Sequence, residues 1–103
     1  MKRQIRQSKS EKAAAREAAE ALAIQALTYI AADGDRLGHF LAESGAGPAE
    51  IRRAAADPGF LLGVLDYVAG DESLLVGLAE EIGFDPFDVA KARLALAGKR
   101  WDG

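Results

Sequence analysis

The sequence has 103 residues, half of them hydrophobic, and a formal net charge of −3 at pH 7. This length favours one domain with a single core. The absence of cysteine excludes disulfide and thiolate chemistry and is typical of a reducing compartment, so we expect a cytoplasmic protein. The first residues are basic but lead into polar ones, so the sequence predicts neither a signal peptide nor a membrane-spanning segment.

The charge is unevenly distributed along the chain. Residues 1–16 carry six basic side chains against Glu11, a net charge of +5, which leaves −8 on the remainder. An acidic body disfavours binding to a nucleic-acid backbone. The basic arm, residues 1–9, contains Lys2, Arg3 and Arg6. These side chains are candidate contacts to RNA, anionic lipid or an acidic protein, and a loose, solvated arm is the alternative.

The first predicted helix begins at Ser8. Ser8 at the N-cap and Glu11 three residues on form a capping box. The helix is rich in alanine as far as Ala21, and large apolar residues follow in 22–30. We therefore expect its second half in the core, while its first half projects or packs lightly.

Caps and prolines predict five further helices. Aspartate before a helix, proline at its first position and glycine just after its end are the usual boundary signals. No segment alternates with period two. The predicted fold class is therefore all-α, a compact six-helix bundle in a single domain over residues 10–97, with a tail at 98–103. The five helices run from Asp33 to Gly45, from Pro48, from Pro58, from Asp71 to Gly83, and from Pro86 to about Leu96.

The fourth predicted helix is apolar on nearly every side. Between Phe60 and Gly70 only Gly63 and Asp66 interrupt large or small apolar residues. Such a helix has to be wrapped by other elements. It spans about 15 Å, half a bilayer, so the wrapping must be protein. We expect this helix at the centre of the bundle, with Leu65 at its middle.

The sequence also repeats itself. Shifted by 38 positions, residues 22–56 match residues 60–94 with nine identities in 35 aligned positions. Tyr29 falls on Tyr67, and the other matches fall on caps, core positions and prolines. This pattern predicts two three-helix units related by an internal repeat and packed through their tyrosine helices. Convergence of unrelated units on the same capping rules is the alternative.

A set of short stretches over roughly residues 20–94 forms one recognisable pattern. The stretches are Ala26-Leu27, Asp33, Asp35-Arg36-Leu37, Phe40-Leu41, Gly45, Asp57-Pro58-Gly59-Phe60-Leu61, Val64-Leu65-Asp66, Asp71-Glu72 and Gly83. In these stretches the chain resembles a family of short bacterial proteins catalogued only as a domain of unknown function, and it departs from that family at Gly34, where the family has proline. The resemblance implies bacterial origin and a cytoplasmic location, and it supplies no activity, cofactor or site residue.

His39 is the single histidine of the sequence. It lies one helical turn from both Asp35 and Glu43, a spacing that could hold a metal ion. These ligands would all stand on one exposed helix, and a solvated polar face is the alternative. We expect no metal and no cofactor.

Other unusual positions lie within or after the later helices. Asp66 interrupts the central helix: a buried carboxylate there would need a partner, whereas the alternative is a bundle-surface position. Glycines at 38, 63 and 77 lie inside helices at about 1 kcal/mol each, which predicts close approach of neighbouring helices. Trp101 lies beyond the last predicted helix and either folds back over the bundle or contacts a partner.

The sequence favours a protein–protein interaction module, an adaptor or regulator with an acidic surface. Its protein partner is unidentified, a second copy of the chain is one candidate, and no membrane partner is expected. The alternative is a nucleic-acid-associated factor that uses the basic arm. An enzyme has least support, because phosphate-binding loops, Ser/His/Asp sets and zinc spacings are absent. It would require convergence of Asp35, His39, Asp66 and Glu72. The candidate partner contacts are Lys2, Arg3, Arg6, Asp66 and Trp101.

Overall fold

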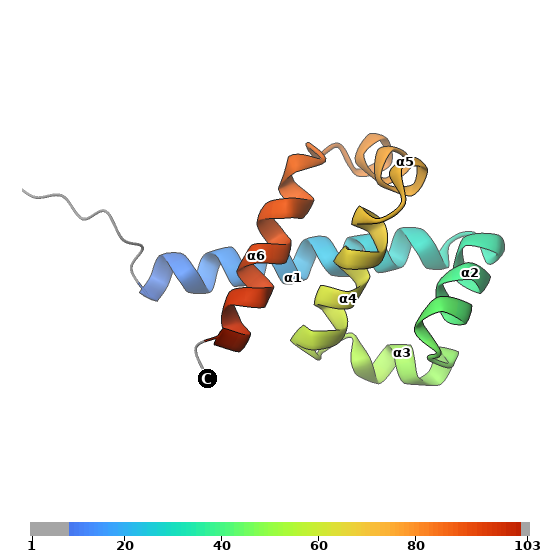
Figure 1. Ribbon diagram of the computed structural model, residues 1–103, viewed down its shortest axis with the longest axis horizontal. Helices are drawn as coiled ribbons and strands as arrows, with labels where there is room; N and C mark the ends of the chain where they lie inside the picture. The colour runs from blue at the N-terminus through green and yellow to red at the C-terminus, as the bar shows by residue number, and fades with distance from the viewer. Residues whose placement is uncertain (1–8, 102–103) are drawn as a thin grey trace, which may run out of the picture.

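The computed structural model describes residues 9–101, and over that range it contains six α-helices and no strand (Figure 1). The predicted all-α class and the six helices are confirmed. The predicted cap at Ser8 and the candidate contacts at residues 2, 3 and 6 lie outside the described residues. The helices are α1 (Lys9–Ala31), α2 (Gly34–Ser44), α3 (Pro48–Ala54), α4 (Pro58–Ala69), α5 (Glu72–Ile82) and α6 (Phe87–Trp101).

Aspartate caps and left-handed glycines set most of the helix boundaries, as predicted. Gly45 and Gly83 follow α2 and α5 with φ of 73° and 86°, a conformation that glycine adopts without steric cost. Four aspartate side chains accept hydrogen bonds from amides in the first turn that follows. The pairs are Asp33 with Asp35 (2.9 Å), Asp57 with Gly59 (2.9 Å), Asp71 with Leu74 (3.1 Å) and Asp85 with Phe87 (2.9 Å).

The predicted end of the last helix near Leu96 is wrong. Helix α6 continues through Gly98 to Trp101, so Trp101 is the last residue of this helix and does not lie beyond it. Gly98 does not adopt the positive φ that ends a helix, and glycine inside a helix costs only about 1 kcal/mol. The side chain of Trp101 lies outside the described part of the chain.

Helices α4 and α6 lie side by side and both cross α1 (Figure 1). Helix α2 packs against the C-terminal end of α1, and α3 connects α2 to α4 at the periphery. The first turns of α1 extend past α6 (Figure 1): no residue of 10–18 is buried, and Ala19 is the first that is. The expectation that the first half of α1 projects or packs lightly is confirmed.

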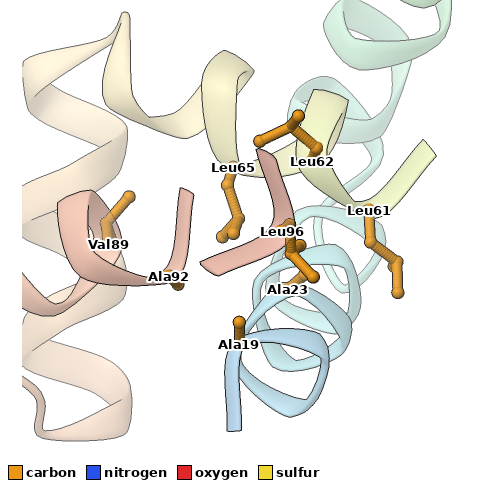
Figure 2. Close-up of a cluster of buried hydrophobic side chains, with 8 residues drawn as sticks. All are labelled: Ala19, Ala23, Leu61, Leu62, Leu65, Val89, Ala92 and Leu96. Atoms are coloured by element: carbon orange, nitrogen blue, oxygen red, sulfur yellow. The ribbon is translucent and has the colours of Figure 1, made fainter. Parts of the chain in front are cut away.

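One part of the core lies where α4 and α6 cross α1 (Figure 2). Small side chains on α1, Ala19 and Ala23, let the leucines of α4 come close to the helix backbone. Removing each large apolar side chain from water contributes about 1.5–3 kcal/mol. The other members of this cluster are Leu61, Leu62 and Leu65 from α4 and Val89, Ala92 and Leu96 from α6.

A second cluster lies toward the C-terminal end of α1. Val64 and Val68 of α4 belong to it, on a face of the helix next to the one that carries the leucines of the first cluster. Helix α4 is therefore buried on two faces, and the prediction of a central, wrapped helix is confirmed. The remaining members are Ala26, Leu27 and Ile30 from α1, Phe40 from α2, and Leu74 and Leu78 from α5.

Candidate binding groove

A groove separates α2 from α4 and reaches the start of α5. It consists of two hollows of about 550 Å³ and 490 Å³. Both are lined by Glu43 of α2 and by Asp66 and Tyr67 of α4, so they adjoin. We call this feature the α2–α4 groove.

The floor of the α2–α4 groove is aromatic. Phe40 extends from α2 toward α4 and is only 2% exposed. Its ring meets Phe60 and Tyr67 edge-to-face, with centroids 6.1 Å and 5.1 Å apart and interplanar angles of 79° and 78°. Edge-to-face pairs of this kind contribute about 0.5–1.5 kcal/mol beyond their buried area. These contacts connect α2 to α4 and give the groove an apolar base.

Three exposed carboxylates lie around this floor, on Glu43, Asp66 and Asp71. Asp71 caps α5, and Asp66 accepts a hydrogen bond of 2.7 Å from Nε of Arg93. Among the described residues, Glu43 has neither a hydrogen-bond nor an ion-pair partner. The groove is therefore anionic, with one carboxylate free to pair with an incoming cation.

The pKa of Tyr67 is shifted by these surroundings. Burial raises the pKa of its hydroxyl above 10.0, and the charges of Asp71 and then Glu43 raise it further. All three causes favour the neutral phenol. At neutral pH the groove therefore holds a phenol hydroxyl that can donate a hydrogen bond.

The cation that lines the groove, Arg36, already has partners at the end of α1. Its guanidinium group lies 3.9 Å from the ring centroid of Tyr29 and donates two hydrogen bonds, of 3.0 and 3.3 Å, to the Tyr29 carbonyl. It also lies 3.6 Å from the Asp33 carboxylate. Arg36 therefore fastens α2 to α1.

The structure brings together some of the sequence-predicted site residues. His39 and Glu43 line the groove with Asp66, whereas Asp35 and Glu72 do not. No group of three or more histidine, aspartate or glutamate side chains within residues 9–101 is arranged to hold a metal ion. Asp66 is exposed, so the surface alternative was correct, and its partner is on α6.

The glycines inside helices have two different surroundings. A Cβ atom added at Gly38 or Gly63 would meet nothing within 4 Å, so the predicted close helix approach is wrong there. Gly63 instead lines the groove. At Gly77 a Cβ would lie 2.6 Å from the hydroxyl oxygen of Tyr29, so this glycine makes room for a side chain of α1 and not for a close approach of two helix backbones.

Sequence reasoning missed the groove because its residues have separate local explanations. Phe40 falls within a predicted helix and Asp71 at a predicted helix start, so neither residue by itself indicates a binding site. In the 38-residue register the groove residue His39 aligns with Gly77, but Glu43 and Tyr67 align with identical residues, so the repeat pattern does not mark the groove.

Comparison with known proteins gives a family. None of the helices in residues 9–101 is long and apolar enough to cross a membrane. No curated protein and no solved structure matches the chain. The family described as "Protein of unknown function (DUF3572)" matches residues 16–99, a range that includes every residue of the groove, as the resemblance over 20–94 implied. The chain therefore belongs to the DUF3572 family of proteins of unknown function.

Proposed function

We propose that this protein is a protein–protein interaction module whose α2–α4 groove binds a segment carrying basic and apolar side chains. One observation carries the proposal: the aromatic floor of Phe40, Phe60 and Tyr67 lies among the carboxylates of Glu43, Asp66 and Asp71. Binding sites in proteins commonly combine an apolar base with a few polar groups that fix orientation.

The physical case rests on what each part of the groove contributes. An apolar side chain placed on the aromatic floor gains about 25 cal/mol for each Å² that it removes from water. A lysine or arginine head group then reaches Glu43 or Tyr67. Complementary charge at a rim mainly raises the association rate and excludes wrong partners.

The alternative functions have less support. The three carboxylates repel phosphate groups, which leaves a nucleic-acid partner only the basic N-terminal region. For an enzyme, His39 and the carboxylates are exposed to water, whereas catalytic groups with tuned pKa values are usually shielded from it. We therefore propose a binding role without catalysis, in the cytoplasm of a bacterium.

The proposal is tested by selecting peptides from a random library on the purified protein. Selected peptides should carry lysine or arginine beside aliphatic or aromatic residues, and their affinity should fall as salt increases. Glu43→Arg should weaken the selected peptides by at least about tenfold. Glu80→Arg, an equal charge change on the exposed face of α5, should have no effect. Selection of no peptide, or equal losses in both variants, would overturn the proposal.

We also propose that residues 22–56 and 60–94 are related three-helix units. Corresponding aspartates, Asp33 and Asp71, cap α2 and α5, and Tyr29 and Tyr67 each contact the second helix of the other unit. The test is the crossing angle of the first two helices in each unit, measured in an experimental structure. Angles that differ by tens of degrees would favour convergence instead.

A further inference from the structure

We propose that the segment bound in the α2–α4 groove is the basic N-terminal segment, residues 2–7, of a second copy of this chain. The inference rests on the proposed function and names the partner. Two copies exchange segments, each placing its own into the groove of the other, and so form a two-fold dimer.

The first argument is complementary chemistry. Residues 2–7 contain three basic side chains, no acidic one, and a single large apolar residue, Ile5. The groove presents three carboxylates beside an aromatic floor. Glu43 has no partner among the described residues, so an incoming cation does not have to displace another. Basic groups therefore match the rim, and Ile5 matches the floor.

The second argument is reach, which excludes the Arg36 end of the groove of the same copy. Tyr29, whose carbonyl binds the groove residue Arg36, lies 20 residues after Lys9 on α1, or about 30 Å along its axis. Even a fully extended chain brings Arg6 no more than about 11 Å from Lys9, and Lys2 no more than about 25 Å. The three basic residues of one copy thus cannot reach this end of their own groove, whereas those of a second copy are not limited in this way.

The third argument is the direction of α1. Its first turns project past α6, and α2 lies at the opposite end of the molecule (Figure 1). No residue of 10–18 is buried, although this stretch is helical. Its basic residues, Lys12 and Arg16, are matched by Glu11 and Glu17, so the net positive charge is confined to the residues before it. The first turns of α1 therefore extend away from the body of their own molecule, where a second copy can reach them.

The first test is the oligomeric state of the full chain, measured by sedimentation velocity over a range of concentration and salt. We expect a dimer that weakens as salt increases. Deletion of residues 2–7 and the variant Glu43→Arg should each raise the dimer dissociation constant at least about tenfold, while Glu80→Arg should leave it unchanged. Circular dichroism melts establish that every variant remains folded. A chain that is monomeric at every concentration, or a dimer unaffected by the deletion, would overturn the inference.

The second test is a charge exchange between two variants. One carries Lys2→Glu, Arg3→Glu and Arg6→Glu, and the other carries Glu43→Arg. Each variant alone would place like charges together in both of its segment–groove contacts, so each should be monomeric. Mixed, they restore the wild-type pairing of basic segment with acidic groove and place the acidic segment beside the new arginine, so a heterodimer should form. A mixture that stays monomeric contradicts the exchange.

These outcomes separate the inference from the proposed function. A monomeric wild type that still selects basic peptides in a Glu43-dependent manner overturns the dimer alone. A protein that neither dimerises nor selects such peptides overturns both.

Discussion

Two tyrosines at corresponding positions produce opposite kinds of packing. Tyr29 of α1 lies against α5, where its hydroxyl oxygen occupies the space beside Gly77. Tyr67 of α4 lies against α2, where it meets Phe40 and borders the open α2–α4 groove. In the 38-residue register, Gly77 corresponds to His39. Gly77 is small, and this lets Tyr29 pack against α5. The packed contact and the candidate site therefore differ in their local side chains and not in a sequence motif.

The third helices of the two proposed units, α3 and α6, also differ in how they pack. Helix α6 has 15 residues and packs against both α1 and α4. Helix α3 has 7 residues, makes only slight contact with other helices, and contributes Ile51 to the edge of the second cluster. Both units nevertheless border the groove, because α2 belongs to the first and α4 to the second. The short α3 connects these two helices at the periphery.

The largest expected effect is on the free energy of unfolding and concerns the packed core away from the groove. Leu65 is fully buried where α1, α4 and α6 meet. Leu65→Ala should cost about 2–5 kcal/mol of the free energy of unfolding, because it removes a buried side chain and leaves a cavity. The control is Leu94→Ala on α6, where the side chain is 74% exposed and the change should stay within about 0.5 kcal/mol. Equal denaturant midpoints for the two variants would show that α4 is not central.

The second prediction compares Gly77, which lies beside Tyr29, with Gly63, which lines the groove. Gly77→Ala places a Cβ 2.6 Å from the Tyr29 hydroxyl, and such overpacking should cost about 1–3 kcal/mol, partly offset by the better helix propensity of alanine. Gly63→Ala meets open space in the groove and should stabilise the protein by up to about 1 kcal/mol. The melting temperatures of both variants, compared with that of the wild type, measure these changes in stability. Stabilisation by Gly77→Ala would show that the Tyr29 contact is looser than described.

The third prediction treats the halves as equivalent. Asp33→Ala and Asp71→Ala each remove an N-cap and should each cost about 0.5–2 kcal/mol. Glu80→Ala, an exposed acid that caps nothing in residues 9–101, is the control. Denaturant titrations measure all three. If the free energy of unfolding falls by very different amounts in the two variants, α2 and α5 differ in helix stability as well as in packing.

How far the sequence predicts this structure depends on the range of the forces involved. Helix starts and ends at Asp33, Gly45, Asp57 and Gly83 were predictable, because capping depends on neighbouring residues alone. The central position of α4 was predictable because its apolar surface exceeds what one face can bury.

The groove was not predictable in the same way. It depends on how far apart α2 and α4 lie, and that separation follows from side chains distant in sequence, such as Phe40 and Tyr67. The same limit applies to Asp66, whose exposed position and pairing with Arg93 depend on the docking of α6. Nor did Gly98 end α6, because glycine permits a left-handed conformation without requiring it.

The smallest expected effect concerns the protonation of Tyr67. Burial raises the pKa of Tyr67, and the charges of Asp71 and Glu43 add to this. Because its pKa in the folded state lies above the unfolded value of 10.0, its contribution to stability is fully present below pH 10.0 and is lost as the pH rises through the folded pKa. The protein should therefore lose stability in the alkaline range, and Tyr67→Phe should reduce that loss.

Replacing Glu43 with glutamine tests whether its carboxylate acts on Tyr67 in the α2–α4 groove. Glu43→Gln removes one of the three causes and should lower the pKa of Tyr67, measured from the tyrosinate absorbance with Tyr67→Phe as the reference that assigns the signal. Glu80→Gln removes an equal charge from α5 outside the groove and should not shift it. A Tyr67 pKa that is identical in the wild type and in Glu43→Gln would place this carboxylate away from the phenol. The groove would then lack the unpaired anion that a basic partner needs.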